Sequence, residues 1–244
     1  MIEVRPLTTL EQFQQAVRLQ QEIWNFSDIE LLPVRLFVVA TRVGGQAFGA
    51  YAGDRMLGFC LAIPGLKPGG GYYLHSHMLG VAEGYRDAGI GRMLKLEQRR
   101  DAIARGIELI EWTFDPLEIK NAYFNMERLG AVVRRFLPNQ YGTTSSPLHG
   151  ALPTDRLVAE WWISSPRVAA SVDGSGFVRP RSEYRIAVPN EIAELRANNP
   201  GRARAVQAGI GDHFQEYFGR GLAVIGFEKT PEAGVYLIGK WESS

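Results

Sequence analysis

The segment Leu79–Gly91 decides the fold of this chain: it reads Leu-Gly-Val-Ala-Glu-Gly-Tyr-Arg-Asp-Ala-Gly-Ile-Gly. An apolar stretch, 72–81, predicts a strand that runs into this segment, and the apolar spacing after it predicts an amphipathic helix. A strand that enters a glycine-lined turn and then a helix presents unpaired backbone N–H groups at the positive end of the helix dipole. Such a turn binds phosphate or pyrophosphate, because Gly89 and Gly91 carry no side chain to hold the ligand away.

Two common phosphate-binding motifs are excluded. The nucleoside-triphosphate loop needs Gly-x4-Gly-Lys-Ser/Thr, which the chain lacks. The dinucleotide fingerprint needs a third glycine where this chain has Leu94. The pattern that fits is Arg/Gln-x-x-Gly-x-Gly/Ala, from Arg86 to Gly91, with Val81 at the end of the preceding strand.

This pattern resembles motif A of the GCN5-related N-acetyltransferase (GNAT) superfamily, whose members bind the pyrophosphate of an acyl-coenzyme A in this turn. The resemblance implies acetyl-CoA or another acyl-CoA as co-substrate. It places the backbone N–H of Leu79 at the thioester carbonyl and pairs Val81 with the pantetheine arm, although by side chain both are plain core residues. The cofactor-binding residues that it implies are Leu79, Gly80, Val81, Arg86, Asp87, Ala88, Gly89, Ile90, Gly91, Arg92 and Asn121.

The element order predicts the architecture. Helices alternate with strands over residues 1–163, which favours a layered α/β domain. The order is strand, two helices, three strands, helix, strand, helix, two strands, and it matches the GNAT arrangement of a mixed, mostly antiparallel central sheet flanked by helices. We therefore expect residues 1–163 to form a GNAT acyltransferase domain. Residues 164–244 are expected to be an α+β extension packed on it, because they are few for a separate core.

Several local expectations follow from turn and cap residues. Thr8 or Thr9 is expected to cap the first long helix. Residues 25–28 break the chain between the first two helices, a place where members of the family often wall the acceptor site. The glycine- and proline-rich stretch 64–71 predicts a loop, and Ser164–Pro180 indicates a linker by its Ser, Gly, Arg and Pro content.

His75 and His77 are the candidate bases. They lie two apart on the strand that ends at Val81, so alternation places both on one face. Histidine titrates near neutral pH and suits the deprotonation of an ammonium substrate. The spacing resembles the arylalkylamine branch of the superfamily, in which the pair deprotonates the amine directly or through water. A plain pair of polar side chains in a sheet is the alternative, and the sequence does not choose between the two histidines.

A second motif, Asn121-Ala-Tyr-Phe-Asn-Met-Glu-Arg-Leu-Gly-Ala, lies on a helix expected from about Glu118 to Leu129. It resembles the family's Asn-x-x-Ala…Tyr-x-x-x-Gly-Phe, which implies that Asn121, or Asn125 one turn later, hydrogen-bonds the cofactor. The tyrosine that often protonates the leaving thiolate is replaced by Met126. Tyr123 is the candidate substitute, although it serves equally well as a core aromatic residue, and a thiol of pKa about 8.5 can leave without an acid.

Composition limits the alternatives. The formal charge of +1 over 244 residues gives no broad field for nucleic acid or an anionic membrane. Cys60, the single cysteine, excludes an internal disulfide and a cysteine-rich zinc site, and its apolar strand indicates a core residue. No apolar run has transmembrane length and no signal peptide opens the chain. We expect a cytoplasmic protein with no metal, no nucleic-acid partner and no membrane partner, and we allow for a homodimer.

The leading hypothesis is an acyl-CoA-dependent N-acyltransferase. It moves an acetyl or succinyl group to a primary amine of a small molecule, such as an amino acid, by direct attack in a ternary complex. The first alternative is a protein-lysine acetyltransferase, and the second is an acyl-CoA-binding sensor without turnover. Met126 at the tyrosine position favours the sensor, whereas the histidine pair favours an enzyme.

Overall fold

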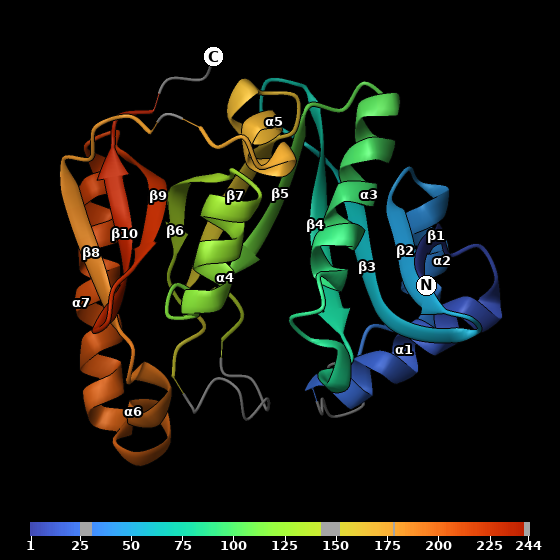
Figure 1. The fold of residues 1–244 in the computed structure, drawn as a ribbon, viewed down its shortest axis with the longest axis horizontal. Helices are drawn as coiled ribbons and strands as arrows, with labels where there is room; N and C mark the ends of the chain where they lie inside the picture. The colour runs from blue at the N-terminus through green and yellow to red at the C-terminus, as the bar shows by residue number, and fades with distance from the viewer. Residues whose placement is uncertain (25–30, 143–151, 178, 242–244) are drawn as a thin grey trace. The chain divides into compact units, whose positions relative to one another are not determined.

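The structure is a computed structural model that describes residues 1–24, 31–142, 152–177 and 179–241. The chain divides into two compact units, Met1–Glu111 and Trp112–Ser244, and each is described here by itself. The helices and strands of both can be followed in Figure 1. Within the described ranges, none of the helices is both long enough and apolar enough to cross a membrane.

The first unit is built on four antiparallel neighbours in the order β1-β2-β3-β4. Their bounds are Ile2–Pro6, Gln46–Ala52, Arg55–Leu66 and Tyr72–Val81. The strand β5, Leu109–Phe114, joins β4 in parallel through the pairs Leu74–Ile110 and His75–Glu111. The helices are α1 (Leu10–Trp24), α2 (Val34–Arg42) and α3 (Ile90–Ala104), and η1 (Glu83–Tyr85) is a short 3₁₀ turn.

Two hydrophobic cores lie on opposite faces of this sheet. On one face α1 and α2 pack through Phe13 and Phe37 against Phe59 of β3. On the other face α3 packs through Ile90 and Leu94 against β2 and β3. The sheet is therefore covered on both sides, and α3 is the helix that lies behind the strand carrying the two histidines.

Local signals explain how the first unit begins. Thr9 Oγ1 accepts a hydrogen bond from the backbone N–H of Gln12 (3.3 Å), and Gln12 Oε1 accepts from the N–H groups of Thr8 (2.7 Å) and Thr9 (3.1 Å). This reciprocal arrangement is a capping box, so the predicted cap is confirmed. The predicted break at 25–28 lies outside the described residues.

The predicted loop 64–71 is wrong in its first part, because β3 continues to Leu66. Pro64 pairs with Leu74 of β4, whereas the last β3 residue that pairs with β2 is Ala62. Beyond Ala62 only β4 adjoins β3. The missing N–H of Pro64 therefore removes no bond on the β2 side.

The second unit contains the strand order β5-β7-β6-β9-β10-β8. The strands β6 to β10 span Val132–Leu137, Arg156–Trp162, Tyr184–Pro189, Ala223–Lys229 and Ala233–Gly239. Its helical segments are α4 (Ile119–Tyr123), the π-helical turn η2 (Phe124–Arg128), α5 (Pro166–Asp173), α6 (Ile192–Asn198) and α7 (Pro200–Gly219). The last strands thus continue the sheet of β6 and β7 within one unit.

The predicted linker at 164–180 is wrong, because residues 166–173 form α5. Ser165 caps this helix, Pro166 occupies its first turn, and Gly174 ends it in the left-handed region, which are ordinary helix boundary signals. Buried Arg167 on α5 donates to the carbonyls of Gly130 (2.9 Å) and Ile225 (2.8 Å). This arginine ties the segment after η2 to β9. The predicted fold class, a mixed, mostly antiparallel sheet flanked by helices, is confirmed.

Candidate functional site

The strand β4 carries one extra residue, at His77. Ser76 pairs with Ala62 of β3, and Met78 pairs with Leu61, so two steps on β4 match one step on β3. Such a β-bulge bends the strand and re-aims the side chains around it. It also reverses the alternation: buried Ser76 before the bulge contacts α3, and Leu79 after it belongs to the core beneath α3.

The two predicted bases lie side by side. The ring centroids of His75 and His77 are 5.9 Å apart, with the planes tilted by 44°. His75 is half-buried and His77 is exposed. Desolvation by neighbouring atoms nevertheless lowers the pKa of the His77 imidazole below its ordinary value. A neutral imidazole at the rim of a site is the form that accepts a proton.

Sequence reasoning missed a carboxylate beside this pair. Glu111 of β5 is the register partner of His75 in the parallel ladder, so the two side chains lie on the same face. Glu111 is only 3% exposed and forms an ion pair with Lys67, whose Nζ also lies 4.7 Å from the centre of the Tyr73 ring. No local pattern links positions 67, 75 and 111, because only the sheet brings them together.

The turn after β4 has the geometry that the sequence predicted. Gly89 is the N-cap of α3 with φ 80° and ψ 0°, in the left-handed region where side chains are strained. Asp87 has φ 65°, an uncommon value for a residue with a side chain. Among the described residues, the backbone N–H groups of Gly89, Ile90 and Gly91 have no hydrogen-bond acceptor within the protein. These amides point out of the first turn of α3 and are available to a ligand.

The glycines near this turn differ in the room that surrounds them. A Cβ on Gly80 would lie 2.6 Å from Trp24 of α1, so that indole packs directly on the backbone of β4. A Cβ on Gly91 would lie 3.6 Å from Leu79, which is an ordinary van der Waals contact. A Cβ on Gly89 would have no atom within 4 Å. Residues 86–89 are exposed, Ile90 is buried, and Leu79, Val81, Gly91 and Arg92 are half-buried.

The second motif belongs to the second unit and is not a single α-helix. After Tyr123 the chain forms the π-helical turn η2, in which the N–H of Leu129 donates to the carbonyl of Phe124 (3.1 Å). Such turns widen a helix by one residue. Asn121 is exposed, whereas Asn125 and Met126 are buried. Exposure favours Asn121 over Asn125 as a ligand-contacting amide.

Tyr123 is half-buried, and its ring is faced by an ammonium group. Lys229 Nζ, at the end of β9, lies 4.2 Å from the ring centroid. A cation over the ring face is attracted to the aromatic quadrupole and fixes the orientation of the ring. Residues beyond 164 thus contribute to the surroundings of this candidate acid.

Cys60 is a core residue, as predicted. It is fully buried on β3, and burial raises the pKa of its thiol to about 12. A thiol in this state is not a nucleophile near neutral pH. Among the residues that the structure describes, no three or more His, Cys, Asp or Glu side chains gather as a metal-binding group.

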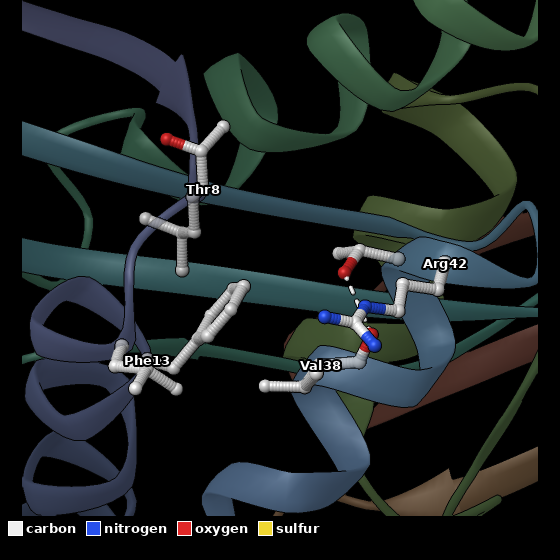
Figure 2. Close-up of a pocket in the computed structure, with 7 residues that line it drawn as sticks. Thr8, Phe13, Val38 and Arg42 are labelled. Carbon is white, nitrogen blue, oxygen red and sulfur yellow. Dashed lines mark hydrogen bonds between the residues drawn. The ribbon is translucent and has the colours of Figure 1, made fainter.

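A hollow of about 340 Å³ lies between the start of α1 and the end of α2 (Figure 2). Leu7, Phe13 and Val38 form its apolar wall, and Thr8 and Arg42 stand at its rim. The Thr41 hydroxyl at its edge donates to the carbonyl of Val38 (3.1 Å). None of the predicted site residues lines this hollow, so it is not the site built around β4.

Comparison with solved structures finds a similar fold in known acetyltransferases. The ribosomal-protein-S18-alanine N-acetyltransferase from Escherichia coli is 17% identical, with a TM-score of 0.54 over 68% of this chain and 96% of that one. Arabidopsis thaliana NAA60 in complex with acetyl-CoA is 15% identical, with a TM-score of 0.55 over 68% of this chain and 100% of that one. No protein-family model and no curated protein matches the sequence. At these identities the likeness shows the fold alone, and that fold is the GNAT fold.

Proposed function

We propose that this chain, which has the fold of the GNAT acetyltransferases, is an acyl-CoA-dependent N-acyltransferase. It moves an acetyl or succinyl group from coenzyme A to a primary amine of a small molecule such as an amino acid. One observation carries the proposal: a single short turn, residues 82–88, joins the strand that holds the histidine pair to the unbonded amides at the start of α3. This arrangement supports a diphosphate site and a proton acceptor on neighbouring segments of the chain.

The turn would hold the diphosphate of the acyl-CoA. The N–H groups of Gly89, Ile90 and Gly91 supply donors at the positive end of α3, and the absent side chains leave the backbone open. Leu79 would donate its backbone N–H to the thioester carbonyl, and Val81 would pair with the pantetheine arm. The other cofactor contacts are assigned to Gly80, Arg86, Asp87, Ala88, Arg92 and Asn121.

The histidines would prepare the acceptor. His75 or His77, directly or through water, accepts a proton from the substrate ammonium, and the free amine then attacks the thioester carbon. The lowered pKa keeps His77 neutral at pH 7. The N–H of Leu79 stabilises the oxyanion that forms as the C–N bond is made. The C–S bond then breaks, and Tyr123 or solvent returns a proton to the thiolate.

The domain division at residue 163 and the cytoplasmic location remain predictions of the sequence. The same holds for the individual site roles. The structure adds that residues beyond 164 stand beside the second motif: Lys229 faces Tyr123, and Glu127 of η2 accepts from the N–H of Phe227 (2.7 Å). We therefore regard the extension as a support for the Asn121–Tyr123 region.

Two observations keep alternatives in view. One similar structure is named for acetylating an alanine of a ribosomal protein, which supports a protein acceptor as the second candidate. Met126 is fully buried where the family often has its tyrosine, which favours a sensor without turnover. The sensor alternative does not explain why two imidazoles lie together beside the predicted thioester position.

Thiol release provides the test. Purified protein is mixed with acetyl-CoA or succinyl-CoA and a panel of amino acids, amines and lysine-containing peptides, and free CoA is measured. Turnover with a small amine supports the proposal, and turnover only with peptides supports the protein acceptor. Saturable CoA binding in calorimetry without thiol release on any acceptor would identify the sensor.

A further inference from the structure

A buried lysine on α3 contacts the strand between the two histidines. Lys95 is 3% exposed, and its Nζ donates to Ser76 Oγ at 2.8 Å. The Ser76 hydroxyl in turn donates to Gln98 Oε1 at 3.0 Å. Ser76 is itself 5% exposed, and it is the residue immediately before the bulge at His77.

We propose that Lys95 is a positioning residue for the proposed acyl transfer: through Ser76 it fixes the bulge of β4 and thereby the placement of His75 and His77. The inference rests on the proposed function only where it assigns acyl transfer as the reaction that His75 and His77 serve. The placement of the imidazoles is a property of the free protein and is measured without turnover.

The position of Lys95 on α3 gives the contact its meaning. Gly91, in the first turn of the helix, presents an amide to the predicted diphosphate, and Lys95 lies about one turn further along the same helix. One rigid helix thus holds both the cofactor turn and the strand that carries the bases. The helix α3 would therefore bind the diphosphate at its start and position the two histidines through Lys95 one turn later.

The network continues into the helix and the neighbouring strand. The backbone carbonyl of Gln98 accepts from Gln46 Nε2 of β2 (2.9 Å), and the same Nε2 donates to Asp101 Oδ2 (2.7 Å). The chain of contacts from Asp101 to Ser76 therefore crosses the face of the sheet beneath β4. Within the described part of the chain, Gln46 Oε1 and Gln98 Nε2 are buried without a hydrogen-bond partner. The paired links from Lys95 through Ser76 to Gln98 Oε1 are therefore the part of this network that fixes the geometry.

A lysine that only fills space would be an expensive choice at this place. Burial lowers the pKa of the Lys95 ammonium to about 7, and the nearby Cys60 thiol on β3 acts on that pKa in the opposite direction. Leucine or methionine would fill the same volume at no such cost. The Ser76 contact is the structural gain that sets this site apart from a plain core position.

The test uses Ser76→Ala, Lys95→Met and the double variant, with Lys240→Met as the control for loss of an exposed lysine. The chain has four histidines, so long-range ¹H–¹⁵N spectra of the imidazoles resolve each ring, with His75→Gln and His77→Gln giving the assignment. The kcat and KM for acetyl-CoA are measured with the amine that gives the fastest thiol release.

We expect each single variant to move the His75 and His77 signals and to leave the signal of His213, on α7, unchanged. The kcat falls about 10- to 100-fold, as expected for a misplaced base, while KM for acetyl-CoA stays within about twofold. The double variant loses no more than either single variant, because both remove the same contact. Lys240→Met behaves as the wild type.

Unmoved imidazole signals in Ser76→Ala and Lys95→Met would overturn the inference, as would losses in kcat that simply multiply in the double variant. If Lys95→Met fails to fold, Ser76→Ala still decides the matter, since it deletes only the hydroxyl. Moved signals in a protein that releases no thiol on any acceptor support the positioning role and reject the proposed function. Full turnover in variants with unmoved imidazole signals would reject the positioning role of Lys95 and support the proposed function.

Discussion

His75 and Glu111 are register partners in the parallel ladder between β4 and β5, and the Glu111 carboxylate is bonded by Lys67. The candidate base therefore lies beside a buried carboxylate whose charge is balanced by Lys67, at the start of the β3–β4 connection. The three residues come from three separate segments: Lys67 from the β3–β4 connection, His75 from β4 and Glu111 from β5. The ion pair of Lys67 and Glu111 thus links the stability of the sheet to the surroundings of the histidines.

Removing the lysine of this pair is expected to destabilise the first unit. Lys67→Met leaves the Glu111 carboxylate buried without its ammonium partner, which costs about 2 kcal/mol, less than a fully buried pair because Lys67 is 32% exposed. Urea unfolding measures the change. Lys67→Met combined with Glu111→Gln should recover part of the loss, and a single Lys67→Met variant as stable as the wild type would contradict the expectation.

Replacement of either histidine is expected to lower kcat rather than weaken cofactor binding. His75→Gln and His77→Gln each remove an imidazole from the proton-accepting pair, and the variant that lacks the base loses about 10²-fold in kcat. The pKa of His77 is lowered, so the acidic limb of the rate profile should fall below pH 6.5 and disappear in His77→Gln. Steady-state kinetics from pH 5 to 9 provide the measurement.

The control for the histidine variants is His213→Gln. His213 is exposed on α7 in the second unit, where its ring stacks on Tyr217 at 6.1 Å between centroids. Its loss should leave kcat unchanged. Equal effects of His213→Gln and His77→Gln would show that the assigned roles are wrong.

Substitutions at Gly91 are expected to separate binding from stability. A Cβ there meets Leu79 at an ordinary 3.6 Å, so Gly91→Ala and Gly91→Val should both fold and gain up to about 1 kcal/mol of helix stability. The motif admits alanine at this position, and Gly91→Ala should keep its affinity for CoA. The branched side chain of Gly91→Val should weaken it about tenfold or more in calorimetry, and unchanged affinity would argue against a diphosphate at this turn.

The stability of the protein should rise with pH because of Lys95. Burial lowers its pKa from 10.5 in the unfolded chain to about 7 in the folded protein. Between these values the unfolded state binds more protons, so the free energy of unfolding increases with pH by at most about 1.4 kcal/mol per unit. Cys60 acts in the opposite direction above pH 9, since burial raises its thiol pKa to about 12.

The window from pH 7 to 9 isolates the lysine. Denaturant unfolding at several pH values in this range should give a rising free energy for the wild type and a flatter one for Lys95→Met. Parallel curves for the two proteins would mean that Lys95 keeps its proton in the folded state over this range, so that burial does not lower its pKa.

Local patterns predicted the strand, turn and helix around Gly89 because each of these elements is specified by nearby residues. They also predicted the fold class, since the order of elements constrains the layers. The linker prediction failed at α5 because its composition outweighed the boundary signals of Ser165 and Gly174. Sequence alternation placed the two histidines on one face, and their rings do lie together, but the bulge that reverses the face between Ser76 and Leu79 has no local signature.

The residues that surround the histidines could not be predicted from the sequence, for a different reason. Glu111 and Lys95 are placed beside β4 by strand pairing and helix packing, which are contacts between distant parts of the chain. No periodicity of the segment 72–81 specifies them. The cofactor turn, by contrast, is built from consecutive residues, so its backbone could be foreseen.

The extra residue at His77 also determines whether β4 can accept the insertion or deletion of a residue. Deleting one residue between Ser76 and Leu79 would restore strict alternation and turn Leu79 and Val81 from the core beneath α3 toward the opposite side. Adding one would do the same. The number of residues from Leu74 to Val81 is therefore fixed by the need to keep both ends of the strand facing the same helix.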